Sequence, residues 1–548
     1  MLKNQNFVII FLHLIFLFVG LFIIKDYGIG LEENFQRISG FYWLKYLLSF
    51  TNFTELQQAA EIKLNELYAY NPQLPLVSNN LAYGIILDVP SALIEILINF
   101  KTNAHNIYLK HSISFFIFLI SSFCFSLILK KRFSNILITA FGTIIYFLSP
   151  KIFGASFFDG KDIFFLSIFT LVIYFYQKYE NNNNIKNLFF LSFLISIAIS
   201  SRLPGLLTLV SFTLIIFFKS LCGIETKKYL KTLFIFIFFT LVLLIIQWPY
   251  LWEFKNNIKQ SYGGLDIKVF FDNHFYHQNN LPFNYIPKWI IISTPIYISF
   301  LFLYGSVIAF KRLFTRIFLI KDNYLKKYSF DFWRGKKENL DFFILLCFVQ
   351  TILIYLFFDN FIFSSWRHFY FVHFFICYFS CMSYNSIFLI FRKKEKTILL
   401  ITLFLSIFIL NQIHKLFIYH PFQNMYFNSF LTKKDKLNYE RDTAQISRYN
   451  AIKEILKDNE SNNKEEIKIG TASWSPLGDI IFLFKPEEIN QLKFIGNNNL
   501  ESADYIFTNY IYEVNINYND KYKIPKNFNL FKSVLKDETL IYSIYKKK

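Results

Sequence analysis

Residues 232–249 read TLFIFIFFTLVLLIIQWP, a run without any charged side chain. A helix needs about 20 predominantly apolar residues to cross the hydrocarbon core of a bilayer. Similar runs recur along the chain, and they predict a polytopic α-helical membrane protein with about eleven transmembrane helices. We place these spans near residues 7–25, 112–129, 134–149, 163–177, 187–200, 203–218, 232–249, 290–310, 340–358, 367–391 and 397–414.

The composition of the chain agrees with this class. Of its 548 residues, 54% are hydrophobic and 21% are aromatic, which lies outside the range of an ordinary soluble domain. The formal net charge is +19, but the basic clusters are scattered between the apolar runs. A nucleic-acid-binding protein gathers such charge on one face or domain, so nucleic acid is excluded as a partner.

Loop charges predict the orientation of the spans. Lys and Arg near span ends favour the cytoplasmic side, and they gather in alternate loops. The N-terminus is therefore predicted to be cytoplasmic and the C-terminal region external, in the inner (plasma) membrane. The first apolar run is long and has no small-residue cleavage site, so we expect a retained anchor. The basic loops lie at 130–132, 227–231, 311–337 and 392–396.

Three parts follow from this topology. Residues 1–418 are predicted to form the membrane domain. Its first external loop, 26–111, is long enough to contain structure of its own, and we expect surface helices at 55–68 and 89–100. Residues 419–548 are more polar and are predicted to form a small extracytoplasmic α/β domain. We expect in it a helix at 443–457 and strands at 467–472, 492–495, 505–508 and 540–545.

Two adjacent carboxylates, Glu32 and Glu33, follow the first apolar run. A general base must lie within hydrogen-bond reach of the proton that it removes, and a low dielectric near a membrane raises the pKa of a carboxylate towards a useful range. The alternative is an ordinary charged flank in a solvated loop. The pair alone leaves both interpretations open.

A second polar cluster, Asp159-Gly160-Lys161-Asp162, joins two predicted spans on the same external side. Two acids and a cation between membrane helices are costly to bury unless they are paired or hydrated. The cluster indicates either a binding site or a hydrophilic turn with a local salt bridge.

Two arginines on the external side suit a phosphate. Arg202 lies at the tip of a nearly uncharged hairpin, and its planar fork offers several donors in fixed geometry. Arg367 and His368 open the tenth predicted span after Asp359, where a cation beside an aromatic residue can stabilise a developing negative charge. The alternatives are a snorkelling arginine and an interfacial Trp anchor with a flanking cation.

Weaker signals complete the inventory. Lys110 and His111 precede the second predicted span, and His274 and His277 lie in a long external loop. The two loop histidines have no obvious third metal ligand, so solvated residues are the favoured interpretation. The five cysteines show no metal-ligand spacing. The sequence contains no Gly-rich phosphate loop, nucleophile elbow or zinc-protease motif, which argues against a cytosolic nucleotide-using enzyme.

Taken in order, these segments resemble the GT-C glycosyltransferases, and most closely the bacterial protein-mannosyltransferase and ArnT-like (glycosyltransferase family 39-like) branch. The resemblance covers most of residues 20–430. In those relatives an Asp-Glu pair opens the first external loop, whereas this chain has Glu32-Glu33. The matching segments are Gly30-Leu31-Glu32-Glu33-Asn34-Phe35-Gln36-Arg37, Ser149-Pro150-Lys151-Ile152-Phe153 with Asp159-Gly160-Lys161-Asp162, Leu281-Pro282 with Tyr285-Ile286-Pro287, Trp366-Arg367-His368-Phe369-Tyr370-Phe371, and His420-Pro421-Phe422-Gln423 with Tyr426-Phe427-Asn428.

The resemblance implies an inverting transfer of a sugar from a polyprenyl-phosphate carrier to a hydroxyl acceptor at the outer face of the membrane. Glu32 or Glu33 would be the base, and Asp162 would orient a cation or the sugar. The acceptor would be a glycan, a lipid or a protein, and a divalent cation beside the two glutamates is left open. Phosphate binding is implied for Arg367, His368, Arg202 and Lys161, and substrate contacts for Asp159, Lys110, His111, Tyr285 and Asp359.

Two other classes of function remain. A flippase or secondary transporter for a lipid-linked substrate would also place polar groups inside a helical bundle. Such proteins often show paired repeats and broken helices at the bilayer midplane, whereas here the polar clusters lie at span ends and no repeat is visible. A structural or receptor protein would tolerate alanine at the loop acids and at Arg367.

Overall fold

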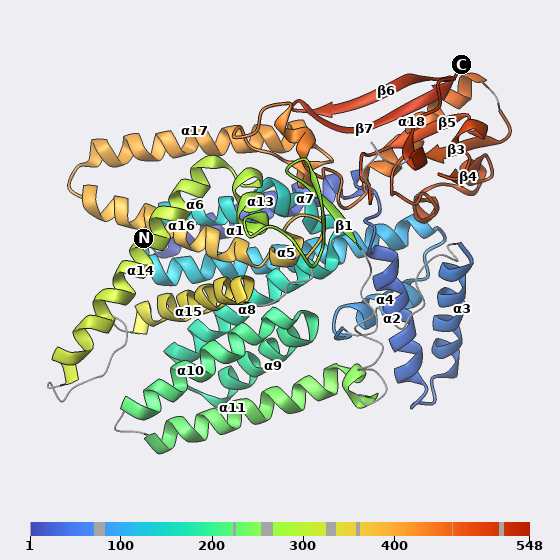
Figure 1. Cartoon of the computed structure of the whole chain (residues 1–548). Coiled ribbons are helices and arrows are strands. Elements are labelled where there is room, and N and C mark those ends of the chain that lie inside the picture. Colours follow the sequence, from blue (N-terminus) through green and yellow to red (C-terminus); the bar gives the residue numbers. More distant parts are fainter. Residues whose placement is uncertain are drawn as a thin grey trace.

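The computed structural model describes residues 2–70, 83–222, 226–253, 267–324, 336–357, 362–462, 464–513 and 520–548. Helices dominate it up to residue 419, and a small sheet with flanking helices follows (Figure 1). The helices are α1 (Leu2–Ile23), α2 (Glu33–Leu48), α3 (Thr54–Tyr70), α4 (Asp88–Ile98), α5 (Asn103–Phe133), α6 (Ile136–Phe147), α7 (Pro150–Phe158), α8 (Gly160–Asn181), α9 (Ile185–Ser201), α10 (Leu206–Cys222), α11 (Thr226–Gln247), α13 (Tyr285–Ser293), α14 (Ile296–Tyr324), α15 (Lys336–Phe357), α16 (Val372–Phe391), α17 (Glu395–Tyr419), α18 (Ser447–Asn462) and α19 (Pro486–Ile489).

Within the described residues, eight helices are long and apolar enough to cross a membrane. They correspond to eight of the predicted spans, and their helices are α1, α5, α10, α11, α14, α15, α16 and α17. A ninth span follows if α6 and α7 count as one, although the chain bends by 55° between them. The bend has a local cause, because Pro150 occupies the first turn of α7 and cannot continue the preceding helix.

The two other predicted spans, 163–177 and 187–200, correspond to α8 and α9. The last turns of α8 contain Gln177, Lys178 and Glu180, which lower its mean hydropathy, and α9 has only 17 residues. Both pack against other helices, α8 against α5 and α9, and α9 against α8 and α11. Most residues of α8 are buried, whereas Phe189 and Phe190 of α9 are exposed.

The helices that follow α1 confirm the two predicted helical segments of the first loop. Residues 55–68 fall in α3 and residues 89–100 overlap α4. Both helices pack against α2, and the three lie at the end of the bundle that also carries the C-terminal sheet, away from the N-terminus (Figure 1).

The C-terminal sheet has five strands in the order β4-β3-β5-β7-β6. β3, β4 and β5 run parallel, whereas β7 runs antiparallel to β5 and to β6. All four predicted strands are present, and the helix predicted at 443–457 is α18. The sequence reasoning missed β6. The bounds are β3 (Ile467–Thr471), β4 (Leu492–Gly496), β5 (Tyr505–Thr508), β6 (Phe528–Lys536) and β7 (Thr539–Lys547).

A second, two-stranded sheet was also missed. β1 (Lys268–Phe271) and β2 (His274–His277) form an antiparallel hairpin whose turn contains Asp272 and Asn273, both with positive φ. This Asp-Asn pair satisfies the left-handed geometry that a two-residue hairpin turn requires. An isolated bridge from Phe271 to Tyr439 joins the hairpin to the segment that precedes α18.

The segment 28–31 is held by the start of the C-terminal unit. Leu31 N donates to Ala444 O at 3.0 Å, and Arg448 Nη2 donates to Ile29 O at 3.1 Å. Gly28 is required here, because a Cβ at this position would lie 2.4 Å from Ile446 O. The helical part of the chain and the C-terminal unit are therefore packed against each other at residues 28–31.

Arg448 joins the two sides of this interface through hydrogen bonds. It is fully buried, donates to the carbonyls of Gln445, Pro476 and Ile29, and lies 3.8 Å from the Asp479 carboxylate. Its removal leaves these groups buried without their partner, which is strongly destabilising.

We therefore expect Arg448→Ala to lower the free energy of unfolding by about 3–5 kcal/mol, measured by thermal or denaturant unfolding of the purified protein. Lys493→Ala is the matched control, because Lys493 forms an exposed ion pair with Glu466. That change should cost about 1 kcal/mol or less. Equal effects of the two substitutions would contradict the assigned role of Arg448.

Candidate functional site

Five segments that are distant in sequence meet at the end of the bundle beneath the C-terminal sheet. They are the start of α2, the α7–α8 junction, the loop after α9, the 3-10 turn before α16, and residues 439–446. Beside them lies a recess with an empty volume of about 420 Å³, part of it open to solvent. Four of the segments line this recess together with Asn424, whereas the loop after α9 does not. Its lining residues are Gly30, Leu31, Glu32, Gln36, Phe158, Asp159, Arg367, Tyr370, Asn424, Thr443 and Ala444.

Glu32 and Arg367 form an ion pair in the recess. Arg367 Nη2 donates to Glu32 Oε1, and the guanidinium carbon lies 4.6 Å from the centroid of the Phe363 ring. Glu32 precedes α2 without capping it, so its carboxylate is available for this contact. The Glu32 side chain is 29% exposed. Arg367 is buried, and its Nε has no hydrogen-bond partner within the described part of the chain.

A second ion pair joins Asp162 to Arg202, with 2.6 Å between Oδ1 and Nη2. Asp159 precedes α8 and accepts from Asp162 N at 3.3 Å, which fixes the first turn of this helix. Asp162 Oδ2 and Arg202 Nε are buried and have no partner among the residues that the structure describes. Both ion pairs thus keep unused hydrogen-bonding capacity.

Tyr83 links the cations of this cluster. Arg202 Nη1 donates to its hydroxyl at 3.4 Å, and Lys161 Nζ lies 2.9 Å from the centroid of its ring. The positive charges of Lys161 and Arg202 lower the pKa of Tyr83. Sequence reasoning did not single out this residue, because nothing local separates it from the other 34 tyrosines of the chain.

Opposing charges set the ionisation of the recess carboxylates. Burial raises the pKa of Glu32, but Arg367, Lys161 and Arg202 outweigh it and lower the pKa to about 2. Burial and the charge of Asp162 raise the pKa of Asp159 well above its ordinary value. The site therefore combines one firmly ionised carboxylate with one that retains its proton more readily.

His368 lies beside this cluster without carrying charge. Burial and the nearby charges of Arg367, Arg202 and Lys161 lower its pKa well below the ordinary value of 6.5. Its ring packs edge-on against Phe363, and its Nδ1 has no partner within the described ranges. A neutral imidazole can exchange a hydrogen bond with a ligand but contributes no positive charge to phosphate binding.

Glu33 faces away from the recess lining. Each of its carboxylate oxygens lies 3.1 Å from His111 Nε2, and one also accepts from Gly30 N at 2.7 Å. Lys110 Nζ donates to the backbone oxygen of Glu33 at 2.7 Å. The side chain is almost fully buried, so the structure places Glu33 and His111 where they hold the start of α2.

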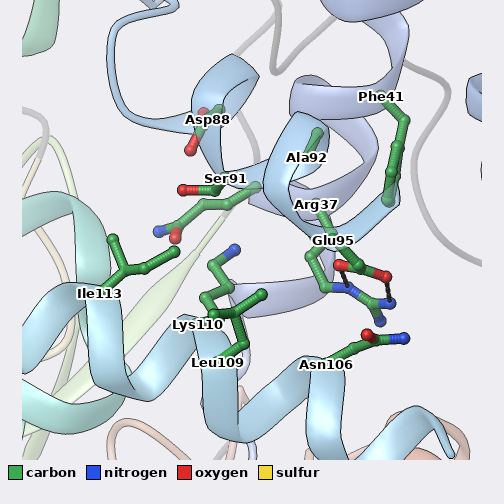
Figure 2. Close-up of a pocket in the computed structure, with 11 residues that line it drawn as sticks. Arg37, Phe41, Asp88, Ser91, Ala92, Glu95, Asn106, Leu109, Lys110 and Ile113 are labelled. Atoms are coloured by element: carbon green, nitrogen blue, oxygen red, sulfur yellow. Dashed lines mark hydrogen bonds and ion pairs between the residues drawn. The ribbon is translucent and has the colours of Figure 1, made fainter. Parts of the chain in front are cut away.

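Lys110 also reaches a second pocket, between α2, α4 and α5, with an empty volume of about 300 Å³. Figure 2 shows its ammonium pointing towards the space beneath Asp88 and Ser91, while Arg37 and Glu95 form a buried ion pair on one wall at 2.6 Å. Gln36 lines both this pocket and the recess. The two spaces are therefore neighbours across α2.

The remaining predicted residues are more distant. Tyr285, at the start of α13, is buried against Phe271 with 4.8 Å between ring centroids and does not line the recess. Asp359 lies outside the described residues. Within the described ranges, no group of three or more His, Cys, Asp and Glu side chains is arranged to hold a metal ion.

Glu440, a carboxylate near the site, was not identified from the sequence. It is buried and accepts from Phe270 N at 3.1 Å. Burial raises its pKa to about 7, and the charges of Arg367 and Lys151 oppose that shift. Its place in the C-terminal polar region gave no indication that it would lie near Arg367.

No protein-family model matches this chain, and the comparison with curated proteins found no match. The geometry of the recess is therefore the basis for assigning a function.

The depressed pKa of Glu32 has a measurable consequence. A carboxylate with a folded-state pKa of about 2 and an ordinary value of 4.5 adds stability that is fully present above pH 4.5. This contribution is lost as the pH falls through 2. We expect the difference in unfolding free energy between the wild type and Glu32→Gln to shrink over this window. Unfolding curves recorded between pH 6 and pH 2 test this, and a constant difference would contradict the Glu32–Arg367 pairing.

Proposed function

We propose that this chain is an integral-membrane inverting glycosyltransferase of the GT-C type, which moves a sugar from a polyprenyl-phosphate carrier to a hydroxyl acceptor. The single observation that carries the proposal is the clustering of Glu32, Arg367, Asp162, Arg202 and Lys161, of which Glu32 and Arg367 line the recess and the cations Lys161 and Arg202 act on the Glu32 carboxylate. An acid–base group and several phosphate-binding cations side by side are what such a reaction requires.

In this proposal the lipid-linked donor enters from the bilayer, with the helices of the bundle as membrane spans and the recess at the external face. Arg367 and Arg202 hold the phosphate. Each has a side-chain Nε without a partner in the described part of the chain, so each can donate further hydrogen bonds. Planar guanidinium groups match the oxygens of a phosphate better than an ammonium group does.

The reaction is then a single displacement. The acceptor oxygen forms a bond to the anomeric carbon while the bond from that carbon to the phosphate oxygen breaks. The acceptor proton passes to the Glu32 carboxylate, and the electron pair of the broken bond leaves with the polyprenyl phosphate. Arg367, Arg202 and Lys161 stabilise the charge that develops on this leaving group.

Donor binding also prepares the base. The cations around the recess lower the pKa of Glu32 to about 2, and such a weak base would remove a proton poorly. A bound phosphate accepts hydrogen bonds from Arg367 in competition with Glu32, and it also adds negative charge beside Glu32. The competition and the added charge both raise the pKa of Glu32, so the carboxylate becomes a better base when the donor is present.

The test is label transfer from radiolabelled polyprenyl-phosphate sugars by the purified protein in proteoliposomes. We expect transfer of the sugar with release of polyprenyl phosphate, and we expect Glu32→Gln to lower its rate ~10²–10⁴-fold without unfolding the protein. Movement of intact lipid between leaflets without cleavage would identify a flippase and overturn the proposal. Near-normal transfer by Glu32→Gln would remove Glu32 as the base.

Glu33→Gln separates the two adjacent glutamates. Because Glu33 binds His111 and Gly30 N, we expect this substitution to lower the unfolding midpoint and to affect transfer mainly through that instability. Glu61→Gln is the control, because Glu61 pairs with Lys45 on the surface of α3. If Glu33→Gln abolishes transfer while its unfolding midpoint is unchanged, the base is Glu33.

A further inference from the structure

The C-terminal sheet has a topological switch point at the carboxyl ends of β3 and β5. The chain leaves β3 towards β4 on one side, and it leaves β5 towards β7 and β6 on the other. Open α/β sheets bind ligands between the carboxyl ends of two parallel strands whose connections diverge in this way. Residues 472–476, 509–511 and 441–445 surround this position, which we call the switch crevice.

Arg441 is an unusual residue of the switch crevice. It is only 7% exposed, yet its Nε and Nη1 have no hydrogen-bond partner among the described residues. The guanidinium carbon lies 4.8 Å from the centroid of the Tyr510 ring. Burial lowers its pKa to about 10, and the Tyr510 and Tyr512 phenols oppose that shift. A buried cation with no anionic partner among the described residues is costly, so this arrangement favours an anionic ligand.

Arg448, seven residues later in the same unit, is a buried arginine with a structural role and serves as a comparison for Arg441. Its guanidinium donates to three backbone carbonyls and lies near Asp479. The two carboxylates that flank Arg441 in the sequence have other partners. Glu440 accepts from Phe270 N, and Asp442 accepts from Ile446 N, from Ser447 N and hydroxyl, and from Asn509 Nδ2. Arg441 differs from Arg448 because its Nε and Nη1 have no partner within the described ranges.

The backbone around Arg441 is strained at two places. Gln445 has φ +59° and Tyr510 has φ +61°, which is the left-handed region that bulky residues rarely adopt. Hydrogen bonds hold both positions, since Gln445 Nε2 donates to Trp474 O at 3.0 Å and Tyr510 N donates to Thr508 Oγ1 at 3.2 Å. Such over-determined strain clusters at ligand sites.

The crevice also presents uncharged hydrogen-bonding groups. Ser473 Oγ and Asn509 Oδ1 are buried and have no partner within the described ranges. Asn509 Nδ2 donates to Asp442 Oδ2 at 3.2 Å and to Ser475 Oγ at 3.3 Å, which leaves its carbonyl oxygen as an acceptor. A ligand that fits these groups has an oxyanion for Arg441 and a hydroxyl group beside it.

We propose that the switch crevice binds an oxyanion, a carboxylate or a phosphate, on a hydroxyl-bearing group such as an acidic or phosphorylated sugar. Thr443 and Ala444, which follow Arg441 closely in the chain, line the recess. A molecule anchored at Arg441 is therefore held next to the recess. Its assignment as the acceptor rests on the proposed function, whereas the binding of an oxyanion does not.

The test measures the unfolding midpoint of the full-length purified protein with inorganic phosphate or acetate, against chloride at equal ionic strength. The Arg367→Gln background removes the principal phosphate contact of the recess. In that background we expect an anion at about ten times its Kd to raise the midpoint by about 2 °C. Adding Arg441→Gln should abolish this shift. A response to phosphate indicates a phosphorylated group, and a response to acetate a carboxylate.

Arg441→Met provides the second measurement. Without an added anion it replaces an uncompensated buried charge by an apolar side chain, so we expect its midpoint to equal or exceed that of the wild type. Adding the anion should reverse the order. The proposal is overturned if neither anion shifts the midpoint, if Arg441→Gln responds like its parent, or if Arg441→Met is less stable with and without anion. None of these outcomes depends on sugar transfer.

Discussion

The site depends on the pairing of carboxylates with guanidinium groups at one end of the helical bundle. Glu32 binds Arg367, and Asp162 binds Arg202. A charge buried without its partner is strongly destabilising, so each pair fixes the relative position of the two segments that carry it. Buried ion pairs are nevertheless poor sources of net stability. Their retention beside an open recess is better explained by a ligand that uses the same charges.

The C-terminal unit belongs to this site. Residues 444–448 hold the backbone of residues 28–31, directly before Glu32, and Asn424, Thr443 and Ala444 form part of the recess lining. The position of Glu32 therefore depends on an interface between the helical bundle and the sheet. If the chain is a transferase, its donor site and the module that selects its acceptor are joined by a few residues of one loop.

Much of the fold could be predicted from the sequence. Long apolar runs are a strong signal, and the C-terminal strands and α18 followed from their periodicity. The short hairpin β1–β2 and the exposed strand β6 were missed, because short segments with few buried side chains carry little periodic signal. The 55° bend between α6 and α7 was not predicted, because it depends on how these two helices pack.

The candidate site was predicted in part. Glu32, Asp159, Asp162, Lys161, Arg202 and Arg367 stood out as charges beside apolar runs, and the structure brings them together. Tyr83, Thr443 and Glu440 could not be found in this way, because their roles arise from contacts between distant segments. The division of roles between Glu32 and Glu33 was equally hidden. One precedes α2 and the other begins it, so their side chains leave the backbone in different directions.

The most direct measurement of the central claim is an experimental structure of the full-length protein with bound polyprenyl phosphate. We predict that the phosphate lies within hydrogen-bond distance of Arg367 and Arg202, and that Glu32 has lost its contact with Arg367. A phosphate bound elsewhere, with the Glu32–Arg367 pair intact, would contradict it.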